Sequence, residues 1–170
     1  MARLPRGVER IAPGPGQESV WDYPRPPRLE ANTRHLVVVL GGEVVAETRG
    51  GYRVLETSHP PQYYFPPEDI SAGALRAAAG GGSFCEWKGE AEYWDVHGGG
   101  AVAGRSAWSY ASPTAPFAPI AGHVAFYVAP MDRCEVDGEV VVPQPGGFYG
   151  GWITSHVVGP FKGVPGSRGW

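Results

Sequence analysis

Cysteine is scarce in this sequence, and a long hydrophobic run is missing. Cys85 and Cys134 are the only cysteines and form no C-x-x-C pair, so one chain cannot supply the four thiolates of a structural zinc site. The longest aliphatic run, residues 36–40, is far too short to cross a bilayer. Residues 1–7 lack the apolar segment of a secretory signal. We therefore expect a soluble, cytoplasmic protein with reduced thiols and no membrane partner.

The charge pattern lacks the basic stripe that nucleic-acid binding requires. Lys and Arg total 14 against 17 Asp and Glu, which gives a net charge of −3, and the arginines are scattered along the chain. A G-x-x-x-x-G-K-[ST] phosphate loop and a tight Asp-x-Asp pair are also missing, so nucleotide transfer around Mg²⁺ is not indicated. We expect no nucleic-acid partner.

Histidine spacing gives no metal motif. None of the five histidines stands at His-x-His or His-x-x-x-His spacing, so a metal site would have to be assembled from distant segments. His59, in a loop before Pro60-Pro61, is the one histidine that we place near a candidate site, and we expect a solvated or core position for each of the five. We predict no metal and no cofactor. The histidines are His35, His59, His97, His123 and His156.

Glycine, proline and aromatic residues, by contrast, are abundant. The 170 residues include 26 Gly, 18 Pro and 12 % aromatic residues, with 42 % hydrophobic residues overall. This length fits one domain, and the hydrophobic fraction is sufficient for a packed core. Because Gly and Pro interrupt both helices and strands, we expect many turns and short strands.

Two segments have the pattern of a β-hairpin. Residues 36–40 and 43–48 are β-branched runs joined by Gly41-Gly42, and residues 134–136 and 139–142 flank Asp137-Gly138. Such dipeptides adopt the positive φ that tight hairpin turns need. Further short strands are expected at residues 53–57, 63–65, 84–87, 92–96, 107–110 and 123–128.

The only helix signal follows Pro66. Asp69 or Ser71 can cap a helix there, the alanines up to Ala79 favour helix, and Gly80 to Gly82 would end it. We therefore predict a mainly β (α+β) fold, a compact antiparallel β domain with one short helix.

Composition divides the chain into three parts. Residues 1–30, rich in Pro, Gly and Arg, form an N-terminal strap, and Trp21 and Tyr23 favour its wrapping over the domain. Residues 31–143 form the core β domain. Residues 144–170 form a Gly-rich and aromatic C-terminal extension, which we expect to pack on the core or on a partner subunit of a homo-oligomer.

Several short motifs occur in a specific order. They are Glu56-Thr57 and Pro60-Pro61, then YYFPPEDI at 63–70, CEWKGEAEYW at 85–94, AWSY at 107–110 with Pro113, and IAGHVAFY at 120–127. This series resembles the domain of unknown function family 427, from residue 20 to residue 142. The resemblance implies a compact β fold similar to the β-tent group. Some family members carry a nucleotidyltransferase-like label, which the residues of this chain do not support.

The resemblance also implies a ligand pocket, because polar groups among aromatic side chains are what an oriented small-ligand site needs. The motif positions that would line it are Glu56, Tyr63, Tyr64, Lys88, Trp94, Trp108 and Tyr110. Arg25 in the strap would suit a carboxylate or phosphate at the mouth of this pocket, unless the strap only covers a sheet edge.

Two residues of this set are candidates for catalysis. A desolvated Lys88 would serve as base or nucleophile, although it can instead pair with Glu56 or Glu86. Cys85, three residues before Lys88, would need a neighbouring cation to react, and a buried strand position is the expectation that we favour.

Three functions are compatible with these residues. The first is binding of a small polar ligand in an aromatic-lined pocket. The second is an enzyme of unknown reaction that uses Lys88 or Cys85 in the same pocket, and the third is a structural or assembly module. We place binding first because the spacing contains no activated nucleophile, metal set or acid–base dyad.

Overall fold

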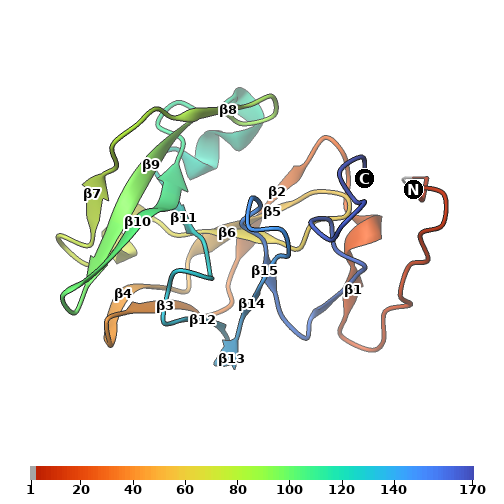
Figure 1. Ribbon diagram of the computed structural model, residues 1–170, viewed down its shortest axis with the longest axis horizontal. Helices are drawn as coiled ribbons and strands as arrows, with labels where there is room; N and C mark the ends of the chain where they lie inside the picture. Colours follow the sequence, from red (N-terminus) through yellow and green to blue (C-terminus); the bar gives the residue numbers. More distant parts are fainter. Residues whose placement is uncertain (1–2) are drawn as a thin grey trace.

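A computed structural model describes residues 3–170, and most of its regular structure is short β-strands (Figure 1). The strands are β1 (Glu18–Ser19), β2 (Arg28–Asn32), β3 (Leu36–Leu40), β4 (Glu43–Thr48), β5 (Gly51–Leu55), β6 (Gln62–Tyr64), β7 (Leu75–Ala77), β8 (Ser83–Cys85), β9 (Gly89–Gly98), β10 (Ala101–Ser109), β11 (Val124–Phe126), β12 (Arg133–Val136), β13 (Glu139–Val140), β14 (Val142–Pro143), β15 (Trp152–Ile153) and β16 (Val157–Val158). The helical segments are three 3-10 helices, η1 (Val20–Asp22), η2 (Pro67–Asp69) and η3 (Ala115–Ile120). The predicted mainly β class is confirmed.

Three antiparallel sheets form the body of the protein. The order of one is β13-β12-β3-β4, and that of the second is β11-β10-β9-β7 with β8 also paired to β9. The third is β2-β5-β6, which lies in Figure 1 between the other two sheets and the two terminal segments. Both hairpins expected from sequence are present, as β3-β4 and β12-β13, and Gly41 and Gly42 adopt φ of 61° and 76° in the first turn.

The predicted helix after Pro66 is wrong. Only one 3-10 turn forms, η2, and residues 75–77 instead pair with β9 as strand β7. Two more backbone bonds extend this pairing, from Ala78 N to Tyr93 O and from His97 N to Ala74 O. Because five of the residues 72–79 are alanines, a helix here would bury little apolar area, and helix propensity is weak compared with pairing to an available strand edge.

The hydrophobic core consists of three clusters. The largest lies between the β3-β4 and β9-β10 sheets and includes Tyr63, Phe65, Phe126 and Trp152. A second lies on β5, β6, β10 and η3 and includes Tyr64, Trp108, Tyr110 and Phe117. Each of these large side chains contributes about 1.5–3 kcal/mol to folding by its burial.

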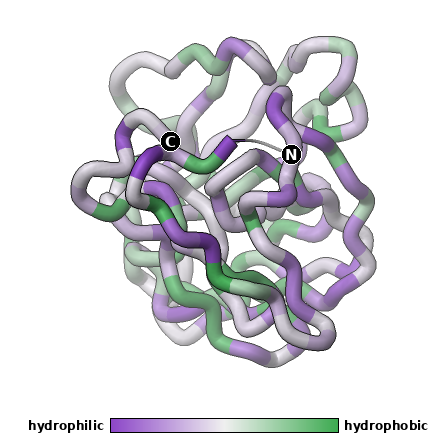
Figure 2. Tube along the Cα trace, turned by 90° about the vertical axis from the view of Figure 1, so that its right-hand side faces the viewer, coloured by the Kyte–Doolittle hydropathy of each residue, from purple (hydrophilic) through white to green (hydrophobic). Residues whose placement is uncertain are grey.

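The third cluster joins the two terminal segments. Trp21 and Tyr23 of the strap pack with Leu55 and Val157, and the Trp21 ring lies 5.5 Å from that of Trp170. β1 and β16 pair in parallel, the Trp21 indole donates to Pro160 O, and both segments lie at the right of Figure 1. Figure 2, which faces this side, shows short hydrophobic stretches alternating with hydrophilic ones. Trp21, Tyr23 and β1 of the strap therefore pack against β5 and the C-terminal segment.

Candidate functional site

Two of the residues predicted to line a pocket lie away from the others. Tyr63 is 2 % exposed in the largest core cluster, and its ring lies 5.3 Å from that of Trp152. The Trp94 indole donates to Ser109 Oγ at 2.9 Å, and its ring borders two grooves on the outer face of β9.

Tyr64 and Trp108 do lie together. The Trp108 indole N–H donates to the Tyr64 hydroxyl at 3.3 Å, and the two rings meet edge to face. Burial raises the pKa of Tyr64 well above its ordinary value, so this phenol stays protonated. The other side of the Trp108 ring contacts Tyr127, at a centroid distance of 4.7 Å.

Arg25 and Glu56 also meet, and His59 joins them. The Glu56 carboxylate lies 2.9 Å from His59 Nε2 and 3.6 Å from Arg25 Nη2, while the same arginine nitrogen donates to Thr57 O. Burial alone would raise the pKa of Glu56, but its interaction with His59 and the charges of Arg25 and Lys88 outweigh burial and hold that pKa below its ordinary value. Glu56 is therefore ionised at neutral pH.

Gln144 determines which ring nitrogen of His59 carries the proton. The backbone N–H of Gly151 can only donate, and it contacts Gln144 Oε1 at 3.0 Å, which fixes the orientation of the amide. The amide NH₂ then faces Lys162 O at 2.9 Å and His59 Nδ1 at 3.0 Å. His59 Nδ1 must accept, so the neutral ring carries its proton on Nε2 and donates it to Glu56.

Lys88 and Tyr110 stand next to this group. Lys88 is 7 % exposed, and its Nζ lies 5.7 Å from the centroid of the Tyr110 ring. Its positive charge is one of the causes of the lowered Glu56 pKa, so the two charges are close enough to interact. Within residues 3–170, however, Lys88 forms no ion pair with Glu56 or Glu86. We call Arg25, Glu56, His59, Lys88 and Tyr110 the polar cluster.

The cysteines lie in different surroundings. Cys85 is partly exposed on β8 and packs against the cluster of Tyr64 and Trp108. Cys134 is buried on β12, and burial raises the pKa of its thiol to about 12. A thiol in that environment is an unreactive core residue.

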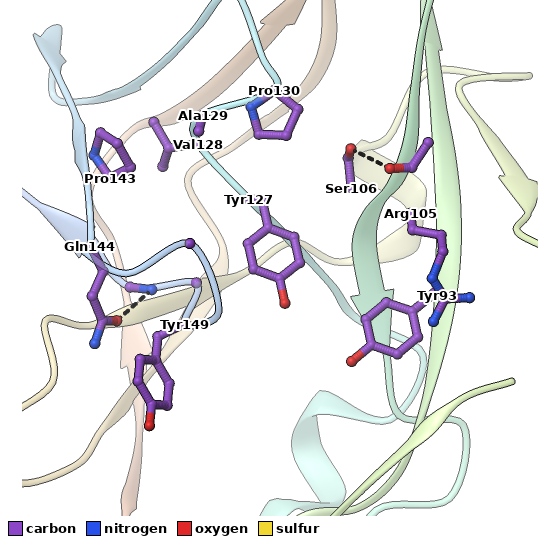
Figure 3. Close-up of a pocket in the computed structure, with 14 residues that line it drawn as sticks. Tyr93, Arg105, Ser106, Tyr127, Val128, Ala129, Pro130, Pro143, Gln144 and Tyr149 are labelled. Carbon is purple, nitrogen blue, oxygen red and sulfur yellow. Dashed lines mark hydrogen bonds between the residues drawn. The ribbon is translucent and has the colours of Figure 1, made fainter. Parts of the chain in front are cut away.

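A cavity of about 400 Å³ lies beside the polar cluster, between β10, the segment after β11 and the C-terminal extension (Figure 3). Its walls include Tyr93, Arg105, Ser106, Tyr127, Gln144 and Tyr149. We call it the tyrosine pocket. In Figure 3, Tyr127 stands between Tyr149 and Gln144 on one side and Tyr93 and Arg105 on the other.

The walls of the tyrosine pocket are held by hydrogen bonds within the protein. The Tyr127 hydroxyl donates to Phe148 O at 3.2 Å, and the Arg105 guanidinium donates to Ala79 O and Gly81 O. Arg105 also lies over the Tyr93 ring, at 4.5 Å from its centroid. This arginine has a φ of 48° at an irregularity in the β9-β10 pairing, which places its side chain on the pocket wall.

The predicted residues form the layer behind these walls. The Tyr149 ring lies 4.9 Å from that of His59, and Gln144 bonds His59 directly. Trp108 supports Tyr127 from behind, and it packs so closely on Gly150 that a Cβ there would overlap its ring. The polar cluster and the tyrosine pocket are thus connected through side chains.

Sequence reasoning missed the residues that line the tyrosine pocket. Tyr93 and Tyr127 stand inside the recognised motifs, so their aromatic character was a usable signal. No signal in the sequence identified Gln144 and Tyr149, because their role depends on contact with His59, which is 85 residues before Gln144.

Residues 3–170 offer neither a metal-binding group nor a membrane-spanning helix. That part of the chain contains no group of three or more His, Cys, Asp or Glu side chains arranged to hold a metal ion. No helix in the same range is long and apolar enough to cross a membrane.

The fold and the site together define a mainly β protein with a cavity of small-molecule size beside a partly buried charged cluster. The family model described as Domain of unknown function (DUF427) matches residues 28–137. The chain belongs to this family. No curated protein matches the chain. Arg25, Gln144 and Tyr149 lie outside the matched range, so part of the site comes from the strap and the extension.

Proposed function

We propose that this protein binds a small polar molecule in the tyrosine pocket. The observation that carries the proposal is the cavity itself, since its volume of about 400 Å³ falls within the usual range for small-molecule sites. Three tyrosines from separate segments converge on it, Tyr93, Tyr127 and Tyr149. Aromatic walls with a few polar groups favour a ligand that has a planar or apolar part and a polar end.

The walls support binding because they are set before a ligand arrives. Gln144 is fixed by Gly151, Lys162 and His59, and Tyr127 by the backbone of Phe148. A pocket whose side chains are already ordered loses little conformational entropy on binding. The buried Glu56 behind His59 adds a fixed negative charge to this support.

The proposal is tested by screening a library of small polar fragments against the full chain by ligand-observed NMR. We expect hits whose affinity falls about tenfold in Tyr149→Ala, because that variant removes one aromatic wall. The matched control is Phe148→Ala, which removes the neighbouring ring, 76 % exposed and not part of the pocket wall. Hits that bind Tyr149→Ala and the wild type equally would place the binding elsewhere.

A further inference from the structure

Lys88 and Tyr110 are buried side chains that carry polar groups without a protein partner. They are 7 % and 5 % exposed, yet in residues 3–170 no hydrogen bond or ion pair satisfies Lys88 Nζ or the Tyr110 hydroxyl. Burying an ammonium without a partner is costly, and structures retain such a group where it has a use. Neither residue lines the tyrosine pocket, so this feature is separate from the function proposed above.

Both polar groups keep some contact with solvent. In residues 3–170, Ser58 Oγ is the only fully enclosed side-chain nitrogen or oxygen that lacks a partner. The Lys88 ammonium and the Tyr110 hydroxyl are therefore not sealed in the core. Nζ lies 5.7 Å from the centroid of the Tyr110 ring, so one small group can contact both.

The polar cluster has one surplus positive charge. Arg25 and Lys88 contribute two positive charges and Glu56 contributes one negative charge, while His59 Nδ1 accepts a hydrogen bond from Gln144. Tyr110 keeps its proton, because burial raises the pKa of its phenol far above the ordinary value. The sum is one positive charge, which suits a monoanion.

The backbone that carries Lys88 is fixed in place. Thr114 N donates to Lys88 O at 3.0 Å, and the Thr114 hydroxyl donates to Trp87 O at 2.6 Å. Gly89, which follows Lys88, has a φ of 108°, a conformation that residues with a side chain rarely adopt. The turn is thus clamped to the segment before η3, and the ammonium is held in position before any ligand binds.

We infer that Lys88 and Tyr110 bind the carboxylate group of a small molecule, one donor to each oxygen. A carboxylate carries the single charge that the cluster lacks and has two acceptor oxygens for two donors. Glu56 disfavours a dianion such as phosphate, since a second negative charge would be left without a partner beside it. The inference does not depend on the tyrosine pocket.

The chain offers a clean probe, because Lys88 and Lys162 are its only lysines. We would label lysine with ¹⁵N and ¹³C and follow both ammonium groups by NMR during titration with acetate, with chloride at equal ionic strength as reference. Lys162 donates to Trp170 O and serves as the internal control, and Lys162→Arg assigns the two signals. We expect saturable shifts of the Lys88 signals alone.

Tyr110→Phe is the decisive variant, because it keeps the ring beside the ammonium and removes only the hydroxyl. We expect its acetate affinity to fall about fivefold, with the free Lys88 signals nearly unchanged. The Glu56→Gln variant raises the surplus positive charge of the polar cluster to two. Inorganic phosphate should therefore gain affinity for this variant relative to acetate. The spectra themselves report whether each variant is folded.

Three results would overturn the inference. The first is a linear, parallel shift of both lysines with acetate, which is the signature of general salt effects. The second is tighter binding of phosphate than of acetate to the wild type. The third is an unchanged acetate affinity in Tyr110→Phe, which would remove the hydroxyl from the site.

Discussion

At the scale of single residues, Glu56 and His59 organise the polar cluster. The Glu56 carboxylate contacts His59 and Arg25, and the charge of Lys88 also acts on it. Gln144 bonds the other ring nitrogen of His59. Each of these side chains therefore depends on its neighbours for its orientation.

Glu56 should make stability depend on pH at the acidic end. Its pKa is lower in the folded protein than in the unfolded chain, so its contribution is complete above the unfolded pKa of about 4.3 and is lost as the pH falls through the folded pKa. Between pH 7 and about pH 3, we expect the wild type to lose about 1–2 kcal/mol more unfolding free energy than Glu56→Gln. Urea denaturation at a series of pH values measures this difference.

The matched control is Glu68→Gln, at an exposed position. Its pH profile should follow that of the wild type. Equal acid sensitivity of the Glu56→Gln and Glu68→Gln variants would contradict the role given to Glu56.

At the scale of the elements, the hairpins were predictable and the helix was not. The β3-β4 and β12-β13 hairpins follow from local turn chemistry, since Gly41-Gly42 and Asp137-Gly138 determine the turns wherever the strands later pack. Residues 75–77 form a strand because β9 presents a partner, and no local pattern in a run of alanines encodes that partner. Strand pairing with a distant segment therefore outweighed the local helix propensity.

Two turns touch at a point where only glycine fits. A Cβ on Gly99, in the β9-β10 turn, would overlap the carbonyl oxygen of Gly41 in the β3-β4 turn. We expect Gly99→Ala to lower the unfolding free energy by about 1–3 kcal/mol more than Gly100→Ala. Gly100 also has positive φ but has open space around it, so it controls for backbone strain. Chemical denaturation of both variants measures the difference, and equal losses would show that strain alone accounts for it.

Arg53 ties three strands together. Its guanidinium, on β5, contacts Glu18 of β1 in a two-pronged arrangement and Glu30 of β2. Arg53→Met should lower the unfolding free energy by about 3 kcal/mol, because it leaves two carboxylates facing one another without their cation. Arg53→Lys should recover only part of this loss, since an ammonium cannot reproduce the planar fork. Full recovery in thermal or urea denaturation would argue against that geometry.

At the scale of the whole molecule, the strap and the extension are parts of the folded body. Trp152 of the extension is 1 % exposed in the largest core cluster and donates its indole N–H to Phe126 O. Composition identified residues 144–170 as a segment too aromatic for a linker, and it left open whether they pack on their own chain. Their contacts with Phe126, Tyr63 and His59 depend on side chains far apart in sequence, which composition does not record.

Removal of the Trp152 ring tests this integration. We expect Trp152→Ala to lower the unfolding free energy by about 3–5 kcal/mol, as for other large core aromatics. Phe148→Ala in the same extension should change it by less than about 0.5 kcal/mol, because that ring is exposed. Similar small losses in both variants, measured by urea denaturation, would mean that the extension is a dispensable appendage.

Part of the candidate site could be predicted from the sequence, because some of its residues stand in recognisable motifs. Lys88, Tyr110 and Glu56 stand in motifs that the family resemblance singled out, and in the structure Lys88 Nζ lies over the Tyr110 ring. Gln144 and Tyr149 complete the arrangement from outside those motifs, so only the folded chain reveals them.

The side-chain hydrogen bonds that link Gln144 to His59 and Glu56 run in one direction. Donation passes from the Gly151 amide to Gln144, from Gln144 to His59, and from His59 to Glu56. A Gln144→Glu exchange replaces one NH₂ by oxygen and leaves the shape of the side chain intact. His59 Nδ1 would then face an acceptor, so this contact would need one more proton, held either on the imidazole or on the new carboxyl group. The exchange of one NH₂ group for an oxygen at Gln144 thus determines how many protons the side chains around His59 hold.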